Sequence, residues 1–369
     1  MSSVNGENPK ILQNFIDGQY VDPVKASSVK YIPVTTPHTG KIIAQCPIST
    51  AEDVDKADRV QALIRFHNLL YAHIEELADL IILEHGKNKS EIQGKILDVS
   101  RGVSCQDARV PLGVVASIVP FNFPIMVPFW TLPIAIATGN TLILKPSEKV
   151  PMTMNRVVAL LKEAGIPDGV VNIVNGTVDA VNSICDHPDI KAVTFVGTSH
   201  VANLVTERCQ KLGKRVLALG GAKNHLIAAP NCNIESTSTD VLLDLICAKA
   251  SSIKPGVKPG EVGPVIDQLS LDKITNYIID SERAGAKILV DGRHWTSQKT
   301  EGFWIGPTVI LHTNKNDKAL HDEIFGPVLS VYQCSSKEEA IEIENGNPYG
   351  NAACIYTTTV WGEYWSSSA

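Results

Sequence analysis

The feature that most constrains the fold is a regular alternation of apolar strands and helices between residues 113 and 229. Short runs rich in Val, Ile and Leu are typical of buried strands, and the longer segments between them have helical spacing. The predicted strands are Gly113–Val119, Thr141–Leu144, Val170–Val174, Ala192–Val196, Arg215–Leu219 and His225–Ala229, and the predicted helices are Pro124–Thr138, Pro151–Ala164, Val178–Cys185 and His200–Leu212. Such strands form a parallel sheet that helices cover on both sides. The fold class is therefore α/β, and ligands are expected where the strands end.

Short extended segments and a long helical region precede this alternation. Residues 14–21 are typical of a hairpin, because Asp17-Gly18 favours a two-residue hairpin turn. No Gly or Pro occurs over residues 51–85, and apolar residues recur there at helical spacing. We therefore predict a helix over 51–85.

A more polar α/β region follows Pro230, where we place a domain boundary. Its predicted helices are Ile234–Ser252, Ser270–Ala284 and Lys337–Glu344, and its predicted strands are Ile288–Val290, Thr308–Ile310 and Val328–Tyr332. The expected organisation is a first domain over 1–229, a second over 230–357, and a tail without a periodic pattern over 358–369.

Composition and charge argue against several classes of protein. The chain has 39 acidic and 33 basic residues, a net charge of −6 that does not suit nucleic-acid binding. The 35 uncharged residues between Arg109 and Lys145 could cross a membrane by length, but five prolines interrupt them. The eight cysteines lie at least 15 positions apart, which is not the spacing of a metal site. The N-terminus has no pattern of a secretory signal or transit peptide, so we expect a cytoplasmic protein with free thiols.

Five short motifs follow in a distinctive order. They are Pro120–Pro124 (PFNFP), Leu144–Lys149 (LKPSEK), Phe195–Thr198 (FVGT), Gly220–His225 (GGAKNH) and Glu323–Val328 (EIFGPV). Together, over about residues 14–357, they resemble the NAD(P)-dependent aldehyde dehydrogenase superfamily. The forms GAKNH, PFNFP and KPSE are similar to the methylmalonate-semialdehyde dehydrogenase branch, and Asn172–Gly176 and Asn347–Asn351 also match that branch.

The resemblance implies a Rossmann-type parallel sheet domain that binds NAD and a second, here incomplete, α/β catalytic domain. It implies NAD-dependent oxidation of methylmalonate or malonate semialdehyde, with coenzyme A as co-substrate and propanoyl- or acetyl-coenzyme A as product. Members of the family are homo-oligomers, and the eukaryotic relatives in this branch are mitochondrial. The implied partners are therefore a small aldehyde and NAD, without a metal.

The resemblance assigns one group of residues at the ends of the first strands to the cofactor. They are Val119, Phe121, Lys145, Glu148 and Lys149. Lys145 and Glu148 leave the end of a strand, and a cation and a carboxylate there can hold the hydroxyls of the adenosine ribose. The alternative interpretation is that Lys145 and Glu148 are two solvated loop residues without a ligand.

Four further residues complete the implied site. Thr198 caps the next helix, whose N-terminal amides favour a diphosphate, and capping alone is its simpler role. Asn122 would donate an amide N–H to the oxyanion that develops on a bound aldehyde, or it is a turn-forming asparagine. Glu323 and Phe325 would hold the nicotinamide ribose and pack near the ring, or they are a surface acid and a core aromatic.

The nucleophile of the family has no counterpart in the sequence. Family members attack the aldehyde with a cysteine in a Gly-Gln-Arg-Cys turn, and that turn is absent here. Cys247 is nearby, but it lies in a helical run, where a buried thiol has a raised pKa and is inert. Cys232 is little better placed to act as the nucleophile. Leu219 stands at the position of the family's usual glutamate base, and the methylmalonate-semialdehyde dehydrogenase branch also lacks that base. We therefore predict that the chain has no nucleophile and is inactive.

Other family segments also lack a counterpart. The helix over 51–85 fuses two family helices, and only residues 101–109 stand where the family has a helix and an oligomerisation hairpin. The chain ends soon after Tyr349, before the last segment of the family. Three explanations of the missing segments stay open: a gene-model error, alternative splicing and a decayed gene copy. The alternative function is a non-catalytic NAD-binding protein, or a subunit that pairs with an intact paralogue.

Overall fold

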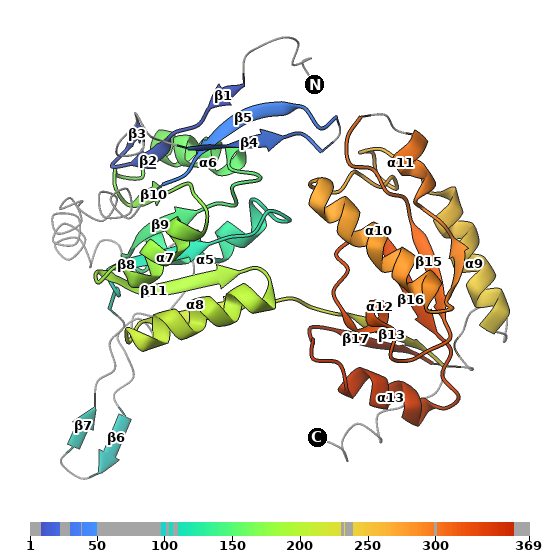
Figure 1. Ribbon diagram of the computed structural model, residues 1–369. Helices are drawn as coiled ribbons and strands as arrows, with labels where there is room; N and C mark the ends of the chain where they lie inside the picture. Colours follow the sequence, from blue (N-terminus) through green and yellow to red (C-terminus); the bar gives the residue numbers. More distant parts are fainter. Residues whose placement is uncertain are drawn as a thin grey trace. The chain divides into compact units, whose positions relative to one another are not determined.

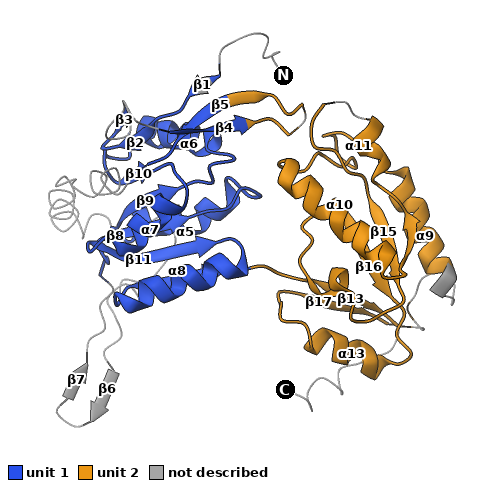
Figure 2. Cartoon of the chain, in the orientation of Figure 1, with its two compact units in different colours: residues 1–34, 44–220 blue, residues 35–43, 221–369 orange. Residues whose placement is uncertain are grey.

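The computed structural model describes residues 9–22, 30–37, 39–49, 97–100, 103–105, 110–229, 232, 239–298 and 301–357. The chain forms two compact units (Figure 2). The first consists of Met1–Val34 and Ala44–Gly220, and the second of Thr35–Ile43 and Gly221–Ala369. The boundary expected at Pro230 falls on a residue outside the described ranges, so the domain limits stay a prediction.

A seven-stranded sheet forms the centre of the first unit (Figure 1). Its order is β12 (Arg215–Leu219), β11 (Ile190–Val196), β8 (Val114–Ile118), β9 (Thr141–Lys145), β10 (Val171–Ile173), β2 (Asn14–Ile16) and β3 (Gln19–Val21). The first five strands are parallel, and β2 and β3 extend the sheet in antiparallel fashion. The predicted parallel α/β sheet is therefore confirmed.

Helices cover both faces of this sheet, because the strands are apolar on both faces. They are α5 (Met126–Ala137), α6 (Met152–Glu163), α7 (Val178–Asp186) and α8 (Ser199–Lys211). Val115 and Leu142 pack with α5 and α6, whereas Ala116 and Ile143 pack with α7 and α8. Successive residues of one strand thus face opposite helix layers, as the alternation of side chains along a strand requires.

The order of the strands reverses at β8. From β8 the chain continues to β9 and β10 on one side, and it then returns to β11 and β12 on the other side of β8. The parallel register places the carboxyl ends of β8 and β11 next to each other. Open α/β sheets bind their ligands at such a reversal. The motifs that follow β8, β9 and β11 therefore lie at the edge of the sheet where a ligand is expected.

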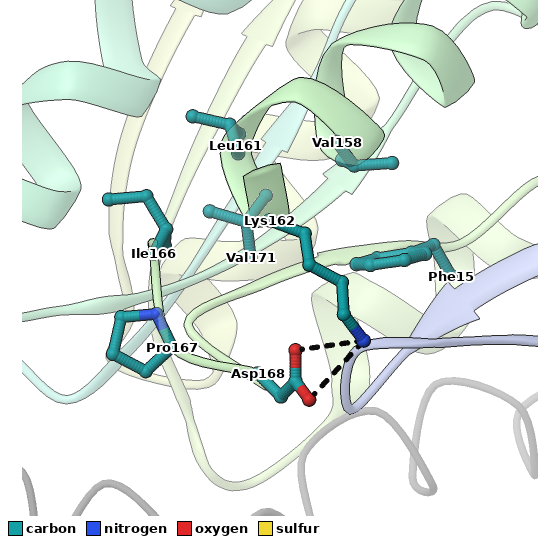
Figure 3. Close-up of a pocket in the computed structure, with 8 residues that line it drawn as sticks. All are labelled: Phe15, Val158, Leu161, Lys162, Ile166, Pro167, Asp168 and Val171. Atoms are coloured by element: carbon teal, nitrogen blue, oxygen red, sulfur yellow. Dashed lines mark hydrogen bonds and ion pairs between the residues drawn. The ribbon is translucent and has the colours of Figure 1, made fainter. Parts of the chain in front are cut away.

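The hairpin predicted over 14–21 is present and is tied to α6. Asp17 and Gly18 have φ values of 50° and 69°, as a type I′ turn requires. The Lys162 ammonium donates to the Gly18 carbonyl at 2.6 Å and pairs with the Asp168 carboxylate at 3.3 Å. A cavity of about 10 Å³ lies beside this pair (Figure 3). It has room for about one water molecule, so it is a packing gap and not a ligand site.

Gly18→Ala is expected to lower the free energy of unfolding by about 2 kcal/mol. The added Cβ would lie 1.9 Å from the Asp168 carboxylate carbon, so the ion pair with Lys162 must move. Gly165→Ala is the matched control, because Gly165 has a φ of +87° and open space around its Cβ position. This control should lose only about 1 kcal/mol. Urea unfolding measures both values, and equal losses would contradict the collision with Asp168.

A buried polar network joins β10 to β2. The Asn14 side-chain amide donates to the Ser49 hydroxyl at 2.8 Å, and the Asn175 backbone N–H donates to the Asn14 side-chain oxygen at 2.9 Å. The Asn172 side-chain oxygen accepts from the Asp17 backbone N–H at 3.1 Å. Asn14, Asn172 and Asn175 are all buried. The motif over residues 172–176 therefore positions the hairpin on the sheet.

The second unit contains two small sheets. Its elements are β13 (His225–Ala228), α9 (Thr239–Ser252), α10 (Gln268–Arg283), β14 (Lys287–Val290), α11 (His294–Gln298), β15 (Thr308–His312), α12 (Lys318–His321), β16 (Val328–Tyr332), α13 (Lys337–Asn345) and β17 (Ala353–Tyr356). One sheet has the order β14-β15-β16, and the other pairs β13 with β17 in parallel. The core of the unit forms where Ile274 and Ile278 of α10 pack with Ile310 of β15.

The structure differs from two of the predictions. We predicted β13 as a strand that follows β12 in the first domain, but it pairs with β17 of the second unit. We predicted only a bridge over 101–109, but β7 (Val103–Cys105) lies in that segment and pairs in antiparallel fashion with β6 (Leu97–Ser100), which precedes it. Apolar and polar residues alternate over Leu97-Asp98-Val99-Ser100 with the period of a strand, and this is the signal that could have identified β6.

Other elements were not predicted individually or lie outside the described residues. A small sheet consists of β1 (Lys10–Ile11), β5 (Ile42–Pro47) and β4 (Tyr31–Thr35). β4 and β5 lie within residues 14–50, which were predicted as short extended segments, whereas β1 was not predicted. The predicted helix over 51–85, the first residues of the helix predicted from Ile234 and the tail over 358–369 lie outside the described ranges. Within those ranges, no helix combines the length and the apolar character that a membrane span needs.

Candidate nucleotide site

Lys145 is the last residue of β9, and its side chain is buried. It ends a strand with five buried residues and lies in register with Ile118 of β8. Pro146 has no N–H with which to extend the ladder, so the strand ends there and the chain turns. The turn brings Glu148 Oε2 to 3.2 Å from Lys145 Nζ, and the two side chains are 28% and 6% exposed. The end of the strand thus presents a cation and a carboxylate that are held together.

The thiol of Cys46 lies close to this ion pair. Cys46 belongs to β5 and is fully buried. Burial raises the pKa of its thiol to about 12, while the Lys145 ammonium lowers that pKa and the Glu148 carboxylate raises it. The thiol is therefore protonated at neutral pH and acts here as a small apolar group. No signal in the sequence pairs Cys46 with Lys145, because about 100 residues separate them.

The segment after β8 lies against the segment after β9. The Val119 N–H donates to the Lys145 carbonyl at 3.1 Å. The Lys149 ammonium lies 4.9 Å from the centre of the Phe121 ring, which is a cation–π contact. Asn122 is exposed in the bend that leads into α5. The structure thus brings together these residues of the predicted site at one edge of the sheet: Val119, Phe121, Asn122, Lys145, Glu148 and Lys149.

Thr198 follows β11 and caps α8. Its hydroxyl accepts a hydrogen bond from the Val201 N–H at 3.5 Å, so the capping contact is present. The first amides of this 13-residue helix carry the positive end of its dipole. A Cβ on Gly220 would come within 2.7 Å of the Ser199 hydroxyl and 3.0 Å of its Cα. Gly220 therefore lets the chain after β12 pass close to the start of α8.

Glu323 and Phe325 lie in the second unit, in the turn between α12 and β16. Glu323 Oε1 accepts a hydrogen bond from the Ala222 N–H at 3.3 Å. Phe325 has a φ of 63°, which is strained for a bulky residue, and its side chain is 48% exposed. Phe325 is therefore not a core aromatic, which removes the simpler of its two interpretations.

Five of the described cysteines lie in surroundings that do not favour a reactive thiolate. Cys247 lies within α9, where burial and the Asp244 carboxylate raise the pKa of its thiol. The pKa of Cys209 is lowered by a hydrogen bond from Cys185, but both thiols are fully buried in the core. The thiols of Cys46, Cys185, Cys247 and Cys334 have raised pKa values, and Cys209, whose pKa is lowered, is not exposed as a cysteine nucleophile needs to be.

Comparisons with known proteins agree with the fold and the motifs. The family model described as "Aldehyde dehydrogenase family" matches residues 89–249 and 239–361. Malonate-semialdehyde dehydrogenase 1 of Geobacillus thermodenitrificans is 38% identical over 418 residues, which is 94% of this chain and 85% of the relative. The structure of methylmalonate-semialdehyde dehydrogenase from Oceanimonas doudoroffii has a TM-score of 0.81 and 31% identity, and covers 97% of this chain and 88% of that one. PnpE from Pseudomonas sp. WBC-3, in complex with nicotinamide adenine dinucleotide, has a TM-score of 0.78 and 28% identity, and covers 95% and 85% of the two chains.

The alignment with the Geobacillus relative is longer than the part of this chain that it covers. The covered 94% of the 369 residues is about 347 residues, so about 71 of the 418 aligned positions have no residue of this chain opposite them. The relative is therefore matched with internal gaps in this chain.

Proposed function

The chain belongs to the aldehyde dehydrogenase family, and from this premise we propose that it binds NAD but does not carry out the cysteine step of its relatives. It is of the malonate-semialdehyde dehydrogenase type by similarity. The observation that carries the proposal is the buried Lys145–Glu148 pair at the end of β9, next to the reversal of the strand order. That pair is the kind of site that holds a nucleotide ribose.

NAD fits the residues at these strand and helix ends. Lys145 donates one N–H to Glu148, and an ammonium has two more for ribose hydroxyls. The first amides of α8 suit a diphosphate. The roles that the resemblance gives to Glu323 and Phe325 of the second unit stay predictions. Bound NAD supplies a hydride acceptor. The complex of the related PnpE with nicotinamide adenine dinucleotide supports this choice of cofactor.

A small semialdehyde is the substrate class that the relatives indicate. Asn122, which is exposed after β8, would donate its amide N–H to the carbonyl oxygen. In the family, a thiolate adds to the carbonyl carbon, hydride leaves, and coenzyme A takes the acyl group from the thioester. The raised pKa of Cys247 and the burial of Cys209 make both thiols unsuited to this step, and the Gly-Gln-Arg-Cys turn of the family is absent from the sequence. The chain would therefore bind these ligands without forming the carbon–sulfur bond.

The unmatched positions of the alignment support the same proposal. About 71 aligned positions lack a residue of this chain. The chain also lacks the Gly-Gln-Arg-Cys turn of the family. A homo-oligomeric state, a cytoplasmic location and pairing with an intact paralogue stay predictions.

Isothermal titration calorimetry with NAD and with AMP tests the proposal. We expect saturable binding of NAD with a dissociation constant below about 1 mM, and competition between the two ligands. AMP carries the adenosine ribose that Lys145 and Glu148 would hold, so it reports on the first unit alone. A folded sample that binds neither ligand at this concentration would overturn the proposal.

A further inference from the structure

Cys185 and Cys209 lie next to each other where two helices of the first unit end. Cys185 belongs to the last turn of α7 and Cys209 to the last turn of α8, and the two helices pack together on one face of the sheet. Both side chains are fully buried in the same core cluster. The Cys185 thiol donates a hydrogen bond to the Cys209 sulfur. The two sulfur atoms are therefore direct neighbours.

An ion pair at the surface joins the same two helix ends. Asp186 and Arg208 directly adjoin the two cysteines in the sequence. Arg208 Nε donates to Asp186 Oδ1, and Arg208 Nη2 donates to Asp186 Oδ2, both at 2.6 Å, which is the bidentate geometry of a strong pair. The arginine and aspartate side chains are 44% and 47% exposed. A single position in each helix thus separates the buried sulfur atoms from groups that contact water.

The surroundings of the pair make the two thiols unequal. The hydrogen bond from Cys185 lowers the pKa of Cys209, although burial raises it. Lys214 and Arg208 lower this pKa further, and Asp186 raises it. Lys214 is close because its backbone N–H donates to the Cys209 carbonyl at 3.0 Å. The pKa of Cys185 is raised, because its thiol is the hydrogen-bond donor and is buried. Cys209 is therefore the sulfur that ionises first.

We propose that Cys185 and Cys209 are an oxidative modification site, at which hydrogen peroxide forms a disulfide bond between α7 and α8. The site is separate from the proposed NAD binding and does not depend on it. Because the two sulfur atoms are already neighbours, the bond can form without a large movement of either helix. Burial keeps both thiols from a substrate in the folded core, so the small peroxide reaches them only when the helix ends open locally.

The reaction consumes one molecule of hydrogen peroxide. The Cys209 thiolate attacks a peroxide oxygen, so that an S–O bond forms, the O–O bond breaks, and the leaving hydroxide takes up the proton that Cys209 released. The Cys185 sulfur then attacks the sulfur of the resulting sulfenic acid. An S–S bond forms, the S–O bond breaks, and the hydroxide leaves as water with the proton of Cys185. The two thiols are oxidised to a disulfide, and the peroxide is reduced to water.

Peptide mapping of the full chain after treatment with hydrogen peroxide tests the inference. We expect the linked Cys185–Cys209 peptides in about half or more of the molecules, and dithiothreitol should reverse the link. Cys46 is the matched control, because it is also fully buried and the pKa of its thiol is raised to about 12. It should be oxidised at least about tenfold more slowly than the pair.

Two results of this mapping would overturn the inference. The first is a pair that stays reduced at a peroxide concentration that oxidises Cys354, whose side chain is exposed. The second is oxidation of Cys46 as fast as that of the pair, because the reaction would then follow general unfolding and not a local property of α7 and α8. The mapping uses the unaltered chain, so it decides the matter whether or not a variant folds.

Serine variants identify the sulfur that attacks the peroxide. Cys185→Ser keeps a hydroxyl that can donate to Cys209 but supplies no second sulfur, so Cys209 should accumulate as a sulfenic acid that dimedone labels. In Cys209→Ser, the Cys185 thiol should be labelled at least about tenfold less, because its pKa is raised. Equal labelling in the two variants would contradict the proposed step.

The disulfide should also stabilise the first unit. It closes a loop of 25 residues, from 185 to 209, and such a link restricts the unfolded chain. We expect the melting temperature of the oxidised chain to rise by about 5 °C and to return on reduction, whereas Cys185→Ser treated in the same way should show no rise. An oxidised chain that carries the link but melts at the same or a lower temperature would show that the bond does not fit the native packing, against the inference.

Discussion

The purified chain is expected to oxidise malonate semialdehyde with NAD and coenzyme A at least about 10⁴-fold more slowly than the Geobacillus relative. The expected loss of rate follows from the absence of a nucleophilic thiolate. Without a thiolate at the carbonyl carbon, no tetrahedral adduct forms from which hydride can leave, and no thioester forms for coenzyme A to attack. Asn122 and the cofactor residues would hold the ligands in place, but positioning alone cannot replace the missing bond.

The rate of NADH formation, followed by absorbance, measures this difference. The relative is assayed in parallel as the positive control, and Cys247→Ala is assayed beside the unaltered chain. Because burial and Asp244 raise the pKa of the Cys247 thiol, this substitution should leave the residual rate unchanged. Turnover within about 100-fold of the relative, abolished by Cys247→Ala, would show that the helix supplies the nucleophile after all.

The sheet and its helices could be predicted because their signals are local. The strands β8 to β12 are short apolar runs that alternate with helices. The short apolar runs indicate buried strands, and their alternation with helices indicates a parallel sheet. The Asp17-Gly18 turn is likewise set by two residues that tolerate positive φ. Strand ends follow from such a pattern, so Lys145 could be placed at the end of β9 from sequence alone.

The contacts that shape the candidate site depend on distant residues, which a single sequence does not pair. Cys46 lies beside Lys145 although about 100 residues separate them, and Lys223 reaches the carbonyls of residues 96 and 99 positions away. β13 carries the same apolar pattern as β12, and only its partner β17 places it in the second unit. Local pattern gives the type of an element, whereas its neighbours depend on tertiary packing.

Lys145→Met should separate binding from stability in the first unit. We expect AMP affinity to fall at least about tenfold, because the substitution removes a charge-assisted donor to the ribose hydroxyls. The melting temperature should change by less than about 3 °C. Methionine fills a similar volume and does not have to be desolvated, and the partner Glu148, at 28% exposed, keeps contact with water after the ammonium is lost.

Lys162→Met provides the matched control for this prediction. Lys162 is also a lysine of the first unit that pairs with a carboxylate, Asp168 at 3.3 Å, but it lies at the hairpin and is 44% exposed. Its removal should leave AMP affinity unchanged. If Lys145→Met lowers the melting temperature and leaves AMP affinity intact, the Lys145–Glu148 pair is a structural contact. In that case the Lys145 ammonium would serve only the packing of β9 and would not bind the ribose. The adenosine site would then have to lie elsewhere.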